Sequence, residues 1–520
     1  MSRTRNTELN VAAGFGTQIV QLIAGFISRT VFIYTLGENY LGISGLFSDV
    51  LSVLSIAELG IGSAITYSLY KPIADNDSRK IKALINLYKK AYRAIGIIVL
   101  SSGILLIPFL KYIVVFKKGV DINYHLIYIL LLINSVISYF FFSYRSIIIE
   151  ANQKSYKVME ISIYIQIITI TIQIISLLTV RNYYVYLVIP IIAGIIKSSI
   201  ISVKAGRMYP IINEPNNEMI DSGEKRKLIK DIYALSFSKI SNIVYKSTDN
   251  ILISSFLGTV LVGLYSNYLM IISIVTSFIN IISNSVRAGI GNLNAGADNK
   301  QKYNVFKKIY FLNFWLYGVC SICLVELSNH FIMLWAGRKF LFQQETVYLI
   351  VFMFLISGIN STVEMFKDAC GIFRETKYWT LAAAVINLVV SIILVKVLGI
   401  NGIFIGTIIA YLSTIFIADP VILYTKVFNK KASGYYLNCL MSLVVIILAF
   451  IVTNYLCGFV ISMGYGGFII KTLMSFCIPN LIYIIIYFRT REFKFYYRLL
   501  RRSVKPSYRY ILRYLKAKIR

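Results

Sequence analysis

Long apolar runs, separated by short polar segments, repeat along the whole chain. Each run has about 20 residues or more, the length that an α-helix needs to cross the hydrocarbon core of a bilayer. The runs lie near residues 11–36, 42–69, 94–116, 126–149, 158–180, 183–203, 233–257, 260–284, 306–335, 346–370, 379–398, 402–425, 436–459 and 467–488. The pattern predicts an all-α polytopic membrane protein with about 14 transmembrane helices.

Composition agrees with this prediction. Hydrophobic residues make up 57% of the 520 residues and charged residues 15%, whereas about a quarter of the residues of a soluble domain are charged. The first run begins near Asn10, and no small-residue cleavage motif follows it, so we expect a retained anchor rather than a cleaved signal peptide.

The positive charge is distributed unevenly between the predicted sides of the membrane. Of the 53 lysines and arginines, 41 fall on the side that carries both chain ends and 7 on the opposite side. Because cytoplasmic loops are enriched in lysine and arginine, both termini are expected in the cytoplasm of a multi-pass protein of the cell membrane.

Similar leucine-glycine stretches occur at three helix reversals: "LGENYLG" at 36–42, "LGTVLVG" at 257–263 and "LGINGIFIG" at 398–406. The first two are 221 residues apart, which predicts two pseudo-symmetric six-helix lobes, although such reversals are also common at helix ends. The predicted organisation is an N-lobe (1–210), a cytoplasmic inter-lobe linker (211–232), a C-lobe (233–430), two C-terminal helices (431–488) and a basic cytoplasmic tail (489–520).

Two basic segments are candidates for contact with lipid headgroups or another partner. "SRKIKALINLYKKAYRA" at 78–94 is amphipathic, and it either lies along the headgroups or extends the third span into the cytoplasm. The tail interleaves arginine and lysine with tyrosine and phenylalanine, a composition that nucleic acid also suits. Since the tail leaves a cytoplasmic helix end, we expect it to bind anionic lipid and no nucleic acid.

Four basic side chains lie deep inside three of the predicted spans. An unpaired charge there is costly, so each should face protein or water and is a candidate functional group. Arginine also suits phosphate, because its planar guanidinium donates two parallel hydrogen bonds. The candidates for a cationic, substrate-binding cavity are Arg29, Lys197, Lys239 and Lys246.

Acidic side chains in or beside the spans are candidates for coupling or for charge pairing: Asp49, Glu58, Asp249, Glu364 and Asp368. Arg29 has Asp49 or Glu58 as a possible partner, but not both, since residues nine apart lie on opposite faces of a helix. Asp249 follows Lys246 at the spacing of a helical pair. Glu364 and Asp368 share a face with Lys367, which favours an internally satisfied cluster or a gate over a cation site.

The sequence contains few of the motifs that are typical of enzymes. There is no GxxxxGK[ST] phosphate loop and no HExxH motif, and only two histidines are present. A "CSIC" motif at 320–323 has no second cysteine pair, so neither a metal site nor another cofactor is expected. Transport would then be coupled to an ion gradient or to the gradient of the substrate itself.

The start "ELNVAAGFGTQIVQLIAGFISRTVFIYTLGENYLGISGLFSDVLSVLSIAELGIGSAI" and the segment "KSTDNILISSFLG" resemble bacterial polysaccharide flippases of the Wzx type. These belong to the MATE-like MOP exporter superfamily. The resemblance implies a non-enzymatic flippase that moves an undecaprenyl-pyrophosphate-linked oligosaccharide from the cytoplasmic to the outer leaflet by alternating access. Arg29 and Lys246 would match the basic lining of its cleft, followed by Lys239 and Lys197. A polysaccharide polymerase and glycosyltransferases would be partners.

Two other functions stay open from sequence. A cation-coupled multidrug exporter would favour carboxylates over bases in its centre, whereas the balance here is positive. A membrane glycan polymerase or ligase would need a large extracytoplasmic loop, and the longest predicted outer loops have about ten residues.

Overall fold

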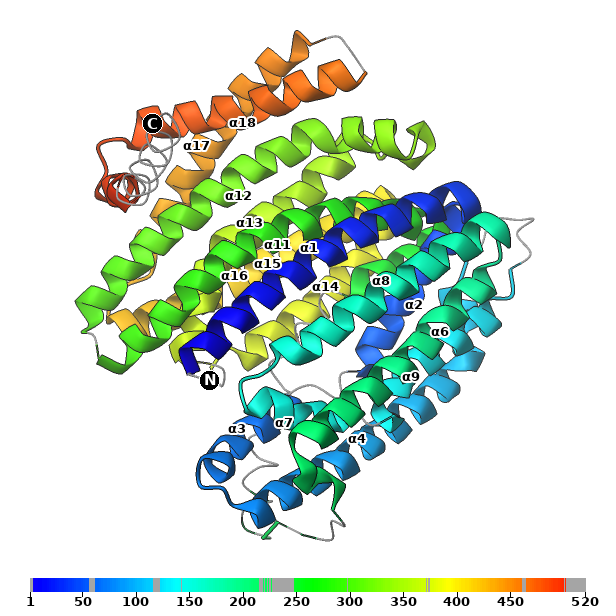
Figure 1. The fold of residues 1–520 in the computed structure, drawn as a ribbon. Coiled ribbons are helices and arrows are strands. Elements are labelled where there is room, and N and C mark those ends of the chain that lie inside the picture. Colours follow the sequence, from blue (N-terminus) through cyan, green and yellow to red (C-terminus); the bar gives the residue numbers. More distant parts are fainter. Residues whose placement is uncertain are drawn as a thin grey trace, which may run out of the picture. The chain divides into compact units, whose positions relative to one another are not determined.

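The computed structural model describes most of the chain. The described residues are 3–55, 61–115, 122–141, 143–214, 218, 220–221, 223, 226, 247–296, 298–370, 372, 375–460, 464–499 and 501. Their regular secondary structure is entirely helical (Figure 1). Of the predicted site residues, Glu58, Lys239 and Lys246 lie outside this part of the chain, as does the tail beyond 501.

The prediction of an all-α polytopic membrane protein is confirmed. Within the described residues, 11 helices are long and apolar enough to cross a membrane, and they coincide with eleven of the fourteen predicted spans. The run at 126–149 corresponds to a shorter apolar helix, Tyr124–Phe140. The run at 42–69 corresponds to two helices, and that at 233–257 is described only from residue 247 onward.

The chain divides into two compact units. The first comprises Met1–Ile274 and Arg374–Ile415. Its elements are α1 (Arg3–Leu36), α2 (Glu38–Leu54), α3 (Ile61–Ala74), α4 (Ser78–Leu106), η2 (Ile107–Phe109), α5 (Leu110–Ile113), α6 (Tyr124–Phe140), η3 (Ser143–Arg145), α7 (Ser146–Ala151), α8 (Tyr156–Thr179), α9 (Tyr183–Met208), η4 (Pro210–Asn213), a helix at 247–257, the first part of α11 (Thr259–Gly296), α14 (Lys377–Leu398) and α15 (Ile400–Ser413). Helices α1, α8, α9, α6 and α4 pack successively against one another (Figure 1).

The second unit comprises Val275–Phe373 and Phe416–Arg520. Its elements are the rest of α11, α12 (Asn299–Trp335), η5 (Arg338–Phe340), α13 (Gln344–Cys370), most of α16 (Ile415–Leu423), the π-helix η6 (Tyr424–Phe428), α17 (Ser433–Gly458) and α18 (Tyr465–Tyr487). Helix α12 packs against α13, α17 and α18. The aromatic core of this unit includes Phe306, Phe366 and Tyr435. The division into two six-helix lobes stays a prediction.

Glycines form the reversals at the leucine-glycine stretches. Gly37, Gly258 and Gly399 all have positive φ, which lets one helix end and the next begin within a few residues. The first two stretches also contact each other. A Cβ on Gly42 would clash with the carbonyl of Thr259, and one on Gly263 would lie 2.7 Å from the carbonyl oxygen of Glu38. Helices α2 and α11 therefore cross at a backbone contact that needs small residues.

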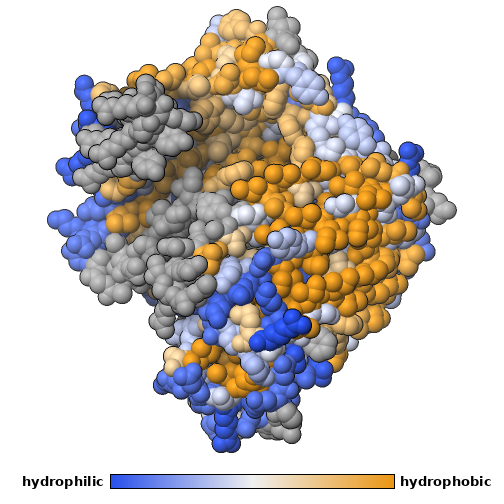
Figure 2. All heavy atoms as spheres, viewed as in Figure 1, coloured by the Kyte–Doolittle hydropathy of each residue, from blue (hydrophilic) through white to orange (hydrophobic). Residues whose placement is uncertain are grey.

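The first unit presents a broad apolar surface and a polar end. Exposed isoleucines on α8 and α9, such as Ile168, Ile175 and Ile192, contribute to the hydrophobic side in Figure 2. Such a surface suits contact with acyl chains, because the side chains are apolar and the backbone polar groups are hydrogen-bonded within the helices. Hydrophilic side chains gather in Figure 2 where Figure 1 places α3 and the start of α4.

The segment 78–94 forms one continuous helix with the span that follows it, which favours the second of the two alternatives. It is the first part of one continuous helix, α4, and its apolar residues Ile81, Leu84 and Ile85 are buried in a cluster with α3 and α7. The beginning of the predicted linker folds back on α4, where Arg79 Nε donates to Glu218 Oε2 at 2.9 Å. An interfacial helix would instead need those apolar residues on its surface.

Candidate functional site

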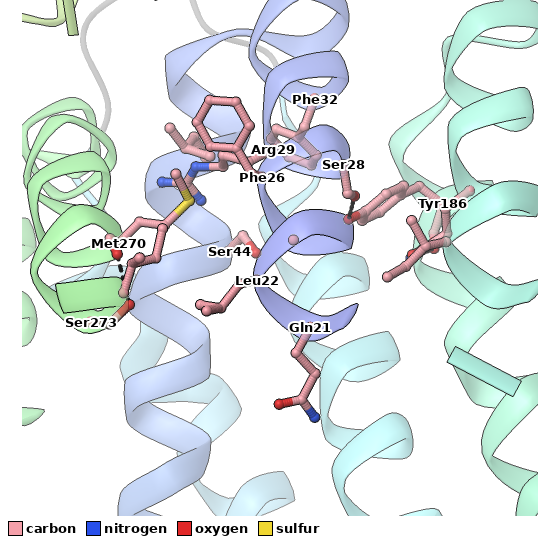
Figure 3. Close-up of a pocket in the computed structure, with 15 residues that line it drawn as sticks. Gln21, Leu22, Phe26, Ser28, Arg29, Phe32, Ser44, Tyr186, Met270 and Ser273 are labelled. Atoms are coloured by element: carbon pink, nitrogen blue, oxygen red, sulfur yellow. Dashed lines mark hydrogen bonds between the residues drawn. The ribbon is translucent and has the colours of Figure 1, made fainter. Parts of the chain in front are cut away.

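A cavity of about 430 Å³ lies within the first unit (Figure 3). Helices α1, α2, α8, α9 and α11 supply its lining, which consists of Gln21, Leu22, Gly25, Phe26, Ser28, Arg29, Phe32, Leu41, Ser44, Ile170, Gln173, Tyr186, Met270, Ser273 and Ile274. This volume is in the range typical of sites for small molecules or for one part of a larger ligand. Among these described lining residues, Arg29 is the one charged side chain.

Arg29 is held by neutral partners on α11. Its Nε and Nη2 donate to Asn267 Oδ1 at 3.2 and 3.0 Å, and Nη2 also donates to Ser266 Oγ. The amide oxygen of Asn267 faces the guanidinium, whereas its amide nitrogen is buried without an acceptor. Nη1 forms no hydrogen bond with the described residues.

Asp49 does not neutralise Arg29 in the described structure. Its Oδ2 instead accepts a hydrogen bond from Asn250 Nδ2 on the helix at 247–257. No carboxylate of the described residues lies within ion-pairing distance of Arg29. Among the described residues, the guanidinium in the cavity wall thus has neutral partners alone.

Uncharged polar and aromatic groups make up another part of the wall. Ser28 Oγ and Tyr186 Oη are 3.5 Å apart, and Gln173 Nε2 donates to the Tyr186 carbonyl oxygen at 3.1 Å. Phe32 meets the Tyr186 ring edge to face at 5.4 Å between centroids. Figure 3 shows Arg29 extending from α1 toward α11, whereas Ser28 points to the side of Tyr186. The cavity thus offers a cation on one side of α1 and hydroxyl, amide and aromatic groups on the other.

A second polar group lies deeper in the first unit, around Asp249. This carboxylate is 4% exposed, and its Oδ1 accepts a hydrogen bond from Thr407 Oγ1 of α15 at 2.8 Å. Asn387 Nδ2 of α14 donates to the same hydroxyl at 2.6 Å, and Asn387 Oδ1 is buried without a hydrogen-bond partner. The described partners of this buried carboxylate are therefore neutral hydrogen-bond donors from α14 and α15.

The remaining predicted residues lie elsewhere. Lys197 is half-buried on α9, outside the cavity lining, and it has no ion-pair partner among the described residues. Glu364 and Asp368 are on α13 in the second unit. Their neighbour Lys367 forms an ion pair with Asp419 of α16, whose side chain is 1% exposed.

Sequence reasoning missed several of these groups. Ser266 and Asn267 are ordinary polar residues in an apolar run, and nothing in their spacing relates them to Arg29. Tyr186 is one of 39 tyrosines, and Gln173 is one of two glutamines in its span. Asp419 had a signal, since an acidic residue before Pro420 inside an apolar run needs a partner. On α11, the stretch "YSNY" at 265–268 contains Ser266 and Asn267. Two adjacent polar residues inside an apolar run are the signal that could have singled them out.

Comparison with known proteins places these features in a family. A family model described as "Polysaccharide biosynthesis protein" matches residues 9–287, a segment that contains Arg29, Asp49, Asp249 and all the lining residues of the cavity. This match confirms the resemblance to polysaccharide flippases seen in the sequence. No curated protein sequence matches the chain.

Solved structures share the fold. The lipid II flippase MurJ in an inward closed conformation aligns with a TM-score of 0.63 at 15% identity, covering 92% of this chain and 98% of that one. An inward-facing multidrug resistance MATE family transporter of the MOP superfamily aligns with a TM-score of 0.57 at 12% identity, covering 78% and 95%. The MATE multidrug transporter DinF-BH aligns with a TM-score of 0.54 at 17% identity, covering 81% and 97%. Both fold and family are those of membrane transporters and flippases rather than of catalytic enzymes.

Proposed function

Because the chain belongs to the polysaccharide biosynthesis protein family, we propose that it is a flippase for undecaprenyl-pyrophosphate-linked oligosaccharide repeat units. It moves them by alternating access from the cytoplasmic to the outer leaflet of a bacterial plasma membrane, for capsule, O-antigen or exopolysaccharide synthesis. Both termini are then cytoplasmic, and the glycosyltransferases and polymerase of the same polysaccharide act before and after it.

One observation carries the proposal: a guanidinium that has no carboxylate partner among the described residues lines a cavity inside a membrane protein. An anion that enters the cavity can pair with this charge, and a pyrophosphate supplies oxygens that two N–H groups bind in parallel. Nη1 has no partner in the described structure, so it is free to make one of these bonds. Phosphate binding at Arg29 is thus the chemistry that the cavity favours.

The opposite wall suits the sugars of the same substrate. Gln21, Gln173, Ser28 and Tyr186 offer amide and hydroxyl groups to sugar hydroxyls, and the tyrosine ring offers an apolar face. The polyprenyl tail needs no such path, because it can remain in the lipid. We place the pyrophosphate at Arg29 and the first sugars toward Tyr186. Lys246, Lys239 and Lys197 complete the basic path in this proposal.

The group around Asp249 is the proposed coupling site. Its carboxylate accepts from the Thr407 hydroxyl and has no cationic partner among the described residues, so it suits a proton or a small hard cation. Binding of a cation would compensate the buried negative charge and so favour one conformation over another. Asp49, Glu58, Glu364 and Asp368 are further candidates for coupling or charge pairing.

Replacement of Arg29 tests the substrate assignment. In Arg29→Ala, export of the glycan should fall by about 100-fold, since a charged hydrogen-bonding group contributes up to about 3 kcal/mol. Surface polysaccharide would be measured in cells that depend on this chain, with protein abundance in the membrane as a check on folding. Lys396→Ala, which removes an exposed charge at the end of α14, is the control. Normal polysaccharide in Arg29→Ala would contradict the proposal.

The alternative, a cation-coupled multidrug exporter, has the support of the MATE-like fold alone. Its substrates are often cationic, and the charged group among the described lining residues is itself a cation. A drug-resistance assay with cells that overproduce the chain separates the two functions, because the flippase proposal expects no change in resistance.

A further inference from the structure

The chain continues beyond its last span as a helix rather than as an unstructured tail. Helix α18 ends at Tyr487, and residues 491–499, here called the juxtamembrane helix, are helical. The hydroxyl of Thr490 accepts from the Phe493 backbone N–H at 3.3 Å and so caps its first turn. Three residues reach about 10 Å at most, so this helix begins within that distance of the end of the last span.

Aromatic contacts with α12 set the rotation of the juxtamembrane helix. Phe493 stacks on Trp315 at 5.9 Å between ring centroids. Tyr496 Oη donates to the Lys308 carbonyl oxygen at 3.1 Å, and burial raises the pKa of this phenol to about 12. Because residues 493 and 496 occupy one face, the docked side of the helix is defined.

Three basic residues occupy the opposite face. Arg491, Lys494 and Arg498 have the spacing i, i+3, i+7, which places them in one stripe, and all three are exposed. We call them the basic stripe. Glu492, the one carboxylate between residues 489 and 501, forms no ion pair with them in the described structure.

More cations lie on α12 and just after η6, in the same unit. Lys308 Nζ is 4.1 Å from the centroid of the Phe495 ring. Lys307 Nζ and Lys430 Nζ lie 5.2 and 4.7 Å from the centroid of the Tyr303 ring. Within the described residues none of these lysines has a carboxylate partner. The rings thus hold the ammonium groups, but their positive charge is not neutralised.

We infer that the basic stripe binds the headgroups of anionic phospholipids in the leaflet that borders the end of α18. Like charges gathered without carboxylates repel one another, and a negative lipid surface relieves that repulsion. The docked face of the helix holds the stripe in a fixed orientation, so the headgroup contact anchors α18 and α12 at one depth. This site is separate from the cavity at Arg29, and it is independent of what the protein transports.

Lipid binding to the purified full-length protein in a neutral detergent tests the inference. Fluorescently labelled phosphatidylglycerol is titrated, with phosphatidylcholine as the neutral probe. The triple variant Arg491→Ala/Lys494→Ala/Arg498→Ala should bind phosphatidylglycerol about fivefold more weakly, even though the remaining basic residues of the tail keep their charge. Its binding of phosphatidylcholine should not change.

Two controls separate the stripe from net charge and from misfolding. Lys111→Ala/Arg338→Ala/Lys339→Ala removes the same charge at exposed positions elsewhere, and it should bind phosphatidylglycerol like the unaltered protein. Arg491→Lys/Arg498→Lys should also retain binding. Equal phosphatidylglycerol binding by the stripe variant and the unaltered protein would overturn the inference. If the stripe variant lost binding to a labelled RNA oligonucleotide while its lipid binding stayed unchanged, the inference would be overturned as well.

Discussion

Arg29 and Lys367 are both basic side chains inside apolar spans, yet their surroundings differ. Lys367 faces the carboxylate of Asp419 on a neighbouring helix, and both side chains are largely buried. Arg29 has only a hydroxyl and an amide oxygen as described partners, and it lines a cavity. A cation with its own carboxylate needs no ligand, whereas a cation with neutral partners is prepared to receive an anion. The pairing of a buried charge therefore distinguishes a structural role from a binding role.

The largest effect is expected at the paired cation. Asp419→Ala leaves Lys367 buried without its counter-charge and should destabilise the protein by about 3–5 kcal/mol. Thermal unfolding of the purified protein in detergent measures this loss. The double variant Lys367→Met/Asp419→Leu should recover most of it, because no unpaired charge remains. If Asp419→Ala unfolds at the same temperature as the unaltered protein, the ion pair is not structural.

An intermediate effect is expected when the Arg29 site is made to resemble the Lys367 site. Asn267→Asp places a carboxylate where the amide oxygen now accepts from Arg29, so the guanidinium is neutralised without a ligand. Glycan export should fall by about 10- to 100-fold, while the unfolding temperature stays the same or rises.

The control for this change is Asn267→Ala, which removes the acceptor but leaves the positive charge in the cavity. Export by Asn267→Ala should exceed export by Asn267→Asp. Equal, normal export by both variants would show that the unpaired charge of Arg29 has no role in transport.

The smallest effect is expected at Asp249. Asp249→Asn keeps the size of the side chain and its acceptor oxygen toward Thr407, but it removes the negative charge. Transport driven by an ion gradient in proteoliposomes should slow by about tenfold, whereas exchange without a gradient should be nearly unchanged. A variant that still responds fully to the gradient would locate the coupling group elsewhere.

Much of the fold was predictable because a bilayer allows few solutions. Backbone groups cannot remain unpaired in hydrocarbon, so long apolar runs become helices, and eleven of the predicted spans are found as such in the described residues. The run at 42–69 was harder, because the described helices there, α2 and α3, are each too short to cross a membrane alone. Segment 78–94 shows another limit: amphipathicity indicates that one face is covered, but a protein core and a headgroup layer cover it equally well.

The candidate site was predictable in part. The depth of Arg29 in its span marked it, since a charge there must have a reason. Its acceptors Ser266 and Asn267 lie more than 200 residues away, and their contact depends on how α1 meets α11. Pairing of Arg29 with Asp49 was equally consistent with the sequence. The structure shows instead that Asn250 binds Asp49.

The sequence by itself determined that this chain is a membrane protein of many helices with rare charges inside it, because the energy of placing a residue in hydrocarbon depends mainly on that residue and its near neighbours. Only the tertiary structure decided which charges are neutralised. Lys367 meets Asp419, and Arg29 meets a hydroxyl and an amide beside a cavity. Electrostatic partners act over a few ångströms, and helix packing alone brings such distant residues within that range.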